Sequence, residues 1–128
     1  MKVTRLVTPS VGNAVITTAG KLRCKAVIHV VGPRNGEGKE NEKLKSAINN
    51  VLNIAQQNDF KSISIPAIST GIFGFPKDKC AKILIEESLK FIKNRGSLPK
   101  SPEIIEFCIY DDETLNQFKK EFNCIKER

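Results

Sequence analysis

Apolar residues recur every three or four positions in three segments of this sequence, which predicts three amphipathic helices. The first runs from about Asn41 to Asn58. The second is expected to begin at Pro76, because proline suits the first helical position. The third follows Asp111 or Asp112, either of which can cap a helix. The expected buried faces are Leu44, Ala47, Ile48, Val51, Leu52 and Ala55, then Cys80, Ala81, Leu84, Ile85, Leu89 and Ile92, and finally Leu115, Phe118, Phe122 and Ile125.

Four shorter segments are rich in β-branched residues, and this composition favours strands. They are Asn13–Thr18, Lys25–Val31, Ser62–Ile65 and Glu103–Tyr110. The segment Lys25–Val31 is almost continuously apolar, which is typical of a strand buried on both faces. The single histidine, His29, lies within it, and we expect this residue to have a structural, hydrogen-bonded role.

The order β-β-α-β-α-β-α predicts an α/β fold, because strands that alternate with helices form a mostly parallel sheet covered by helices. We expect a three-layer α/β/α sandwich with a mixed, mostly parallel sheet. The sequence has no internal repeat and no long linker, so residues 1–128 are predicted to form one domain.

The net charge of +7 indicates an anionic partner, although the lysines are spread along the chain and interleaved with glutamates. The sequence has no tryptophan and one tyrosine, so it lacks the aromatic platform of single-strand-binding proteins. Weak nucleic-acid binding therefore stays a secondary possibility. No apolar run approaches the ~20 residues of a membrane helix, and no membrane association is expected.

The four cysteines are far apart and form no C-x-x-C motif. This spacing predicts buried, reduced thiols in an intracellular protein, cytoplasmic or nuclear, rather than a disulfide scaffold or a zinc site. No metal and no cofactor is predicted.

The segment Pro66–Pro76, PAISTGIFGFP, connects a predicted strand to a predicted helix and contains no charged residue. Ligands of open α/β sheets bind at the carboxyl ends of strands, and the start of a helix attracts anions. Gly71 and Gly74 are expected to take positive φ and to let the backbone approach a ligand, while Ser69 and Thr70 add hydroxyl donors. Because the loop has no lysine, it is not a P-loop. It suits a diphosphate held by backbone groups, although a β–α turn that binds nothing can have the same composition.

Three longer stretches, AVITTAGKLRCKAVIHVVGP, ISIPAISTGIFGFPKDKCAKILIEE and IIEFCIYDDETLNQF, resemble the macrodomain family of ADP-ribose-binding modules. The resemblance extends from about Gly12 to Phe118. It implies a macrodomain-like fold that binds ADP-ribose or mono-ADP-ribosylated proteins. The form ISTGIFGFP is most similar to macrodomains of multi-macrodomain ADP-ribosyltransferases, and related hydrolases have a similar loop.

The resemblance also implies which residues bind the ligand. Phe73 matches the aromatic residue that packs against the distal ribose, and Tyr110 matches the aromatic position beside the adenine. The loop whose backbone amides hold the diphosphate corresponds to Ser69, Thr70, Gly71, Ile72, Phe73 and Gly74.

This sequence starts after three features with which macrodomains normally begin. These are an acidic residue at the adenine, an Asn-rich stretch near the distal ribose and a Gly-rich first loop. We therefore expect an N-terminally shortened domain, either a fragment or a natural short form, with one wall of the pocket missing. Such a half-pocket predicts weak or undetectable binding of ADP-ribose by this chain alone. Uncovered sheet edges make a homodimer possible.

Two other functions remain open from the sequence. One is an ADP-ribosyl-protein hydrolase, but the residues tied to that chemistry lie mainly in the missing segment, so no catalytic residue is assigned. The other is a scaffold that binds no nucleotide, or that contacts nucleic acid through its basic surface.

Overall fold

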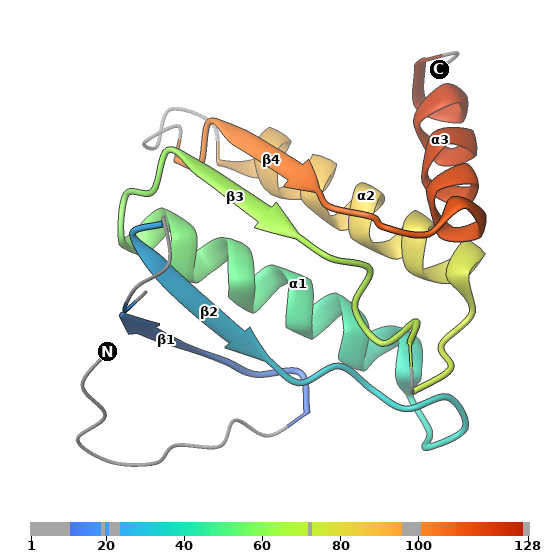
Figure 1. The fold of residues 1–128 in the computed structure, drawn as a ribbon. Coiled ribbons are helices and arrows are strands. Elements are labelled where there is room, and N and C mark those ends of the chain that lie inside the picture. Colours follow the sequence, from blue (N-terminus) through green and yellow to red (C-terminus); the bar gives the residue numbers. More distant parts are fainter. Residues whose placement is uncertain (1–10, 19, 21–23, 72, 96–100, 127–128) are drawn as a thin grey trace.

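The element order matches the order predicted from the sequence (Figure 1). The computed structural model describes residues 11–18, 20, 24–71, 73–95 and 101–126. In chain order the elements are β1 (Ala14–Thr18), β2 (Ala26–Val30), α1 (Glu40–Gln57), β3 (Ser62–Ile65), α2 (Lys77–Asn94), β4 (Ile104–Phe107) and α3 (Asp112–Lys126). The predicted α/β class is confirmed.

The described strands form two separate pairs rather than one continuous sheet. β1 and β2 pair antiparallel, with Ala14 opposite Val30, and β3 and β4 pair parallel, with Ser62 opposite Ile104. β2 and β3 lie side by side and run in the same direction, but no ladder joins them (Figure 1). The predicted mixture of parallel and antiparallel pairing is present, and the break in the sheet was not expected.

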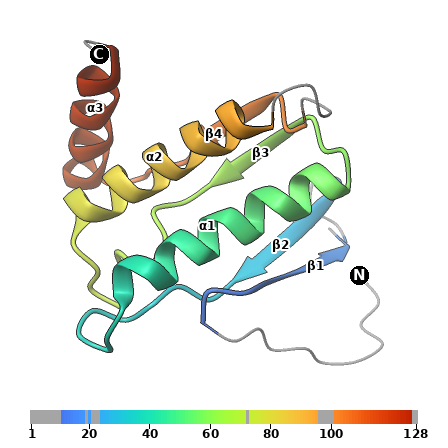
Figure 2. The ribbon, with the colours of Figure 1, turned by 180° about the vertical axis from the view of Figure 1, so that it is seen from behind.

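Helices α1 and α2 lie on the same side of the strands; α1 is seen behind the gap between β2 and β3 in Figure 1 and in front of the strands in Figure 2. Both helices are rich in leucine, isoleucine and alanine on the faces that meet the strands, and their burial forms most of the core. The buried cluster consists of Leu44, Ile48, Val51, Leu52, Ile65, Ile68, Phe75, Cys80, Ala81, Ile83, Leu84, Ile85 and Phe118.

Helix α3 is attached to this core through aromatic side chains. Phe118 is 2% exposed, and its ring lies 5.4 Å from the ring of Phe107 on β4. Phe122, one turn later, is 44% exposed although its ring is 6.3 Å from the same partner. Of the predicted stripe of α3, Phe118 is therefore buried, Leu115 and Ile125 are half-buried, and Phe122 is exposed.

The prediction that the second strand is buried on both faces is wrong. The side chains of β2 are half-buried at most, and His29 is exposed. On this exposed face, Thr17 Oγ1 and His29 Nε2 are 2.9 Å apart, so the expected hydrogen bond of His29 is present. α1 and α2 cover only the other face, which explains why a continuous apolar run does not mean burial here.

The beginnings of α2 and α3 have different caps. The carbonyl of Pro76 accepts the first bond of α2 from Cys80 N at 2.9 Å, so Pro76 is the N-cap and not, as predicted, the first helical residue. Asp111 caps α3, because its Oδ2 accepts from Thr114 N at 3.0 Å and from Thr114 Oγ1 at 2.8 Å. These two bonds hold the pKa of Asp111 below its usual value.

Two further predictions concern the burial of the cysteines and the absence of a membrane helix. Cys80 is buried, as expected, but Cys24, Cys108 and Cys124 are exposed, so the prediction of buried thiols holds for one of the four. All four are free. Within the described residues, every helix is too short or too polar to cross a membrane.

Candidate ligand-binding site

Two loops meet where β2 and β3 end. The first, residues 31–39, connects β2 to α1, and the second, residues 66–76, connects β3 to α2 (Figure 1). They are joined by a backbone hydrogen bond from Asn35 N to Phe73 O of 2.9 Å. Because β2 and β3 run in the same direction, their carboxyl ends bring both loops to one edge of the molecule, where ligands of α/β proteins bind.

The second loop is shaped by its own backbone. Phe75 N donates to Ser69 O at 2.9 Å, Gly74 N donates to Gly71 O at 3.0 Å, and Thr70 Oγ1 donates to the carbonyl of Ala67 at 2.8 Å. Ser69 has φ of 69° and Gly74 has φ of 70°. The prediction of positive φ is thus correct for Gly74 and wrong for Gly71, since Ser69 takes the left-handed conformation instead.

The first loop holds the second in place through a close contact at Gly32. A Cβ on Gly32 would lie 2.0 Å from Ser69 Oγ and 2.5 Å from Ile68 Cγ2. Only a glycine allows the second loop to approach the first so closely. Ser69 Oγ is buried and has no hydrogen-bond partner in the described part of the chain.

Two backbone N–H groups of the second loop remain available for an anion. Those of Thr70, Gly74 and Phe75 donate within the loop, and those of Gly71 and Phe73 have no backbone acceptor among the described residues. The loop then enters α2, whose first-turn N–H groups and dipole favour negative charge. Backbone groups can therefore bind an anion at this position without a basic side chain.

Phe73 and Arg34 supply an aromatic ring and a positive charge at the rim of the loop. The guanidinium carbon of Arg34 lies 5.1 Å from the centre of the Phe73 ring, which is cation–π geometry. Phe73 is half-buried and Arg34 is exposed. Sequence reasoning missed Arg34, although its position just after a strand and the Gly32-Pro33 turn was a usable signal.

Tyr110 follows β4 at the same edge of the molecule, and it is 93% exposed, so its ring packs against almost nothing in the described structure. It is free to contact a ligand, but the protein itself does not fix its position. Ile72 lies outside the described residues, so its predicted role is not addressed by the structure.

The nearest cation on α2 is already paired. Lys77 Nζ lies 2.9 Å from Glu113 Oε2 and 3.7 Å from Asp111 Oδ2, both on or next to α3. The hydrogen bond with Glu113 is the main reason that the pKa of Lys77 is raised. Arg34 is therefore the better candidate for attracting an anion to the loop.

Burial keeps the thiol of Cys80, which lies beneath the loop, protonated at neutral pH. Cys80 Sγ is 3.4 Å from the carbonyl of Ile68, and burial raises the pKa of this thiol to about 12. Pro66–Pro76 itself contains no titratable side chain. The loop 66–76 thus offers backbone N–H groups, two hydroxyl groups and an aromatic ring, and none of its side chains is an acid or a base.

The fold and this site define a class of α/β proteins that bind ligands at the carboxyl edge of the strands. The chain belongs to the Macro domain family, whose family model matches residues 2–84. The family resemblance found in the sequence is thereby confirmed.

Two similar curated proteins are both named O-acetyl-ADP-ribose deacetylase. The protein from Citrobacter rodentium is 46% identical over 111 residues, covering 85% of this chain and 60% of the relative. The protein from Salmonella newport is 47% identical over 111 residues, with the same coverage. This chain thus spans 60% of the length of these relatives. The more specific similarity to multi-macrodomain ADP-ribosyltransferases stays a prediction.

Solved structures share the fold. A mutant macrodomain from Oceanobacillus iheyensis, determined with ADPR, has a TM-score of 0.85 at 22% identity and covers 94% of this chain and 63% of its own. A Trypanosoma brucei macrodomain in complex with ADP-ribose has a TM-score of 0.78 at 24% identity, covering 91% and 46%. These similarities confirm the predicted macrodomain-like fold.

Proposed function

We propose that this chain binds ADP-ribose or mono-ADP-ribosylated protein, with the diphosphate on the backbone N–H groups of the Ser69–Gly74 loop. One observation carries this proposal: an uncharged loop with open N–H groups leads into α2 and is held against the first loop at Gly32. Membership of the Macro domain family and the ADP-ribose named with two similar structures support it. Phe73 contacts the distal ribose in this arrangement, and the exposed Tyr110 covers the adenine.

The affinity of the chain by itself is expected to be low. Binding at about 1 μM requires about −8 kcal/mol. Two or three charge-assisted hydrogen bonds contribute about 1.5–3 kcal/mol each. They must first offset at least ~4 kcal/mol for the translational and rotational freedom that is lost on association. We expect a dissociation constant well above 1 μM, because the exposed Tyr110 is not positioned in advance.

The substitution Gly71→Glu tests the proposal. A Cβ on Gly71 meets nothing within 4 Å and its φ is not positive, so the fold tolerates a side chain here. A carboxylate a few ångströms from the diphosphate is expected to weaken binding by about 10–100-fold through charge repulsion. Gly71→Gln is the matched control, since it has nearly the same size and no charge.

Calorimetric titration with ADP-ribose measures both variants and the parent chain. The proposal requires that the parent and Gly71→Gln bind with similar affinity and that Gly71→Glu binds about 10–100-fold more weakly. Equal affinity of Gly71→Glu and Gly71→Gln would exclude the loop as the diphosphate site.

A second candidate function is hydrolysis of O-acetyl-ADP-ribose or of ADP-ribosylated protein, favoured by the printed names of relatives that are 46–47% identical. The loop offers no titratable group, so binding remains our first choice. Acetate release from O-acetyl-ADP-ribose, measured with and without the chain, separates the two functions.

The remaining predictions concern partners and location. Nucleic-acid binding would show as a strong decrease of affinity with salt that does not depend on Phe73. A homodimer would appear as twice the chain mass in light scattering. An intracellular location stays a prediction, and the bacterial relatives give no support to a nuclear one.

A further inference from the structure

Arg34 and Phe73 are held beside each other by the backbone of the two loops. Asn35 N, directly after Arg34, donates to the carbonyl of Phe73 at 2.9 Å. The guanidinium carbon of Arg34 lies 5.1 Å from the centre of the Phe73 ring. Because the backbone bond joins the loops next to both side chains, it keeps the ring within reach of the guanidinium. Arg34 is thus a built part of the rim of the candidate site.

The hydrogen-bond donors of Arg34 are still free. A guanidinium is planar and carries five N–H donors in a fixed fork, which matches the two oxygens of a carboxylate. The Phe73 ring attracts the positive charge but accepts none of the conventional hydrogen bonds of such a fork. Arg34 is exposed, and no residue in the described part of the chain accepts a hydrogen bond from its side chain. It can therefore bind a carboxylate from a ligand with two parallel hydrogen bonds.

The acidic side chains of the first loop are already engaged. Glu37 accepts from Lys43 Nζ at 2.8 Å and from the backbone N–H of Arg34. Glu40 accepts from Gly38 N at 2.9 Å. These hydrogen bonds hold the pKa of both carboxyl groups below the usual value. Within the described ranges no carboxylate forms an ion pair with the guanidinium of Arg34, so its positive charge remains available at the rim.

The start of α2 adds little net charge to this rim. Lys77 is paired with Glu113 and Asp111, as described above. The next two residues, Asp78 and Lys79, are exposed and have opposite charges. The contrast with Arg34 makes this arginine the group that distinguishes an acidic from a basic ligand at the loops.

The position of Arg34 indicates which part of a ligand meets it. In the proposed arrangement the diphosphate lies on the loop Ser69–Gly74 and the distal ribose lies against Phe73. ADP-ribose is joined to a modified protein through this ribose. Arg34, on the ring of Phe73, therefore lies next to the point where the polypeptide leaves the ligand. Side chains that flank the modified residue would come within reach of the guanidinium.

We propose that Arg34 is a specificity residue, which selects ADP-ribose attached to acidic segments of protein. This inference rests on the proposed function and adds a class of target to it. A Glu or Asp side chain beside the modified residue accepts hydrogen bonds from the guanidinium, whereas a Lys or Arg side chain is repelled. At an exposed site one such charge pair changes the affinity by up to about fivefold.

The test uses the full chain and three ADP-ribosylated peptides that differ only in flanking charge. Each is acetyl-Z-Z-Gly-X-Gly-Z-Z-amide, where X carries ADP-ribose through a triazole, a link that hydrolysis does not cleave. Z is Glu in the first peptide, Gln in the second and Lys in the third. Amide NMR titrations at about 50 mM and about 500 mM salt give the affinities of the peptides and of free ADP-ribose.

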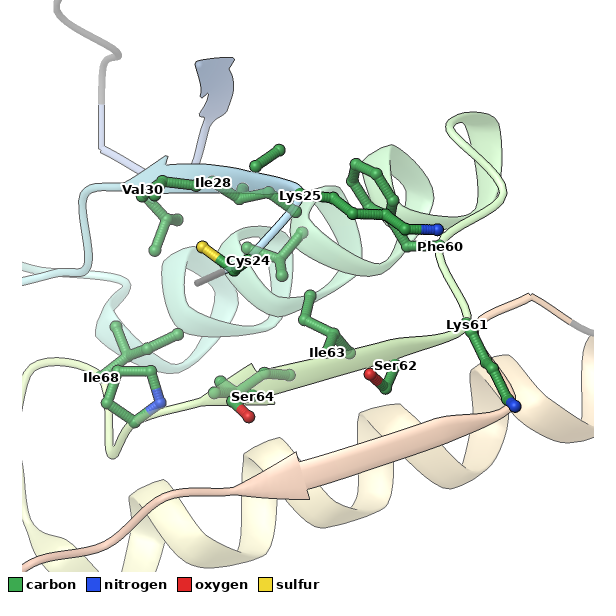
Figure 3. Close-up of a pocket in the computed structure, with 15 residues that line it drawn as sticks. Cys24, Lys25, Ile28, Val30, Phe60, Lys61, Ser62, Ile63, Ser64 and Ile68 are labelled. Carbon is green, nitrogen blue, oxygen red and sulfur yellow. The ribbon is translucent and has the colours of Figure 1, made fainter. Parts of the chain in front are cut away.

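Three variants of the chain complete the test. Arg34→Gln removes the charge, and Arg34→Lys keeps the charge but loses the planar fork. Lys61→Gln is the matched control, because it removes an exposed cation at the opposite end of β3 from the second loop. Figure 3 shows Lys61 before this strand and Ile68 beyond its end. Any effect of Arg34 on the diphosphate is common to the three peptides and cancels in the ratio of their affinities.

We expect the parent chain and Lys61→Gln to bind the Glu peptide at least about threefold more tightly than the Gln peptide, and the Lys peptide most weakly. The preference should disappear in Arg34→Gln, be reduced in Arg34→Lys, and shrink in the parent at high salt. A purely structural role of Arg34 would weaken all three peptides equally.

Two kinds of failure are distinguishable. Equal binding of the Glu and Gln peptides by the parent, or an unchanged preference in Arg34→Gln, would overturn this inference and leave ADP-ribose binding in place. Absence of binding by every peptide and by free ADP-ribose at millimolar concentration would overturn the proposed function and this inference together.

Discussion

Gly32→Ala tests how the candidate site is held together. The new Cβ would lie 2.0 Å from Ser69 Oγ and 2.5 Å from Ile68 Cγ2, whereas ordinary van der Waals contact begins at 3.4 Å. Rotation of Ser69 can relieve the first overlap, but Ile68 is 7% exposed and belongs to the core, so the loop itself must shift. Overpacking of this kind costs about 1–3 kcal/mol. At about 4 °C per kcal/mol for a domain of this size, the melting temperature should fall by about 4–12 °C.

Thermal and urea unfolding measure this loss of stability, and Gly71→Ala is the control. Because a Cβ on Gly71 meets nothing within 4 Å, that variant should stay within about 0.5 kcal/mol of the parent. In a Ser69→Gly background the cost of Gly32→Ala should decrease by at least about 0.5 kcal/mol, since one of the two clashes is gone. The reasoning is refuted if Gly32→Ala is as stable as Gly71→Ala.

Three further predictions concern the core, the cap of α3 and the buried thiol. Phe118→Ala should cost about 3–5 kcal/mol in urea unfolding, and the more exposed Phe122→Ala clearly less; equal costs would contradict the packing of α3. Because the pKa of Asp111 is lowered in the folded chain, its ionised carboxylate stabilises the fold at pH values above 3.8, the ordinary pKa of this group. This contribution is lost as the pH falls through the folded pKa. The stability difference between the parent and Asp111→Asn, from urea unfolding at several pH values, should therefore be largest at neutral pH and shrink in acid; a constant difference would contradict this cause. Iodoacetamide should label the three exposed cysteines of the native chain at neutral pH and leave Cys80, whose pKa is about 12, unlabelled until unfolding; mass spectrometry detects either result.

The helices were predictable because the residues that a helix buries recur every three or four positions in the sequence. The buried residues of α1 are the six that the spacing indicated. The predicted ends of the strands were less accurate, because the length of the partner strand decides where a ladder stops. The expected strand Glu103–Tyr110 stops at Phe107, because its partner β3 has only four residues. Local sequence does not contain this information.

The candidate site was predictable in part. The loop Pro66–Pro76 and its position before a helix followed from local composition. The contact of Gly32 with Ser69 and the position of Arg34 over Phe73 depend on two segments that are far apart in the chain. The separation of β2 from β3 is likewise a property of long-range pairing. For the same reason, spacing did not indicate that Cys108 and Cys124 face solvent.

An amide NMR titration of the 128-residue chain with ADP-ribose tests the central claim most directly, because it detects weak binding and identifies the residues involved. We predict saturable shifts at the amides of Ser69–Gly74 and at the first turn of α2, with the same shifts absent from Gly71→Glu. No shifts at millimolar ligand, or shifts confined to residues outside this loop, would contradict the assignment of ADP-ribose to this site.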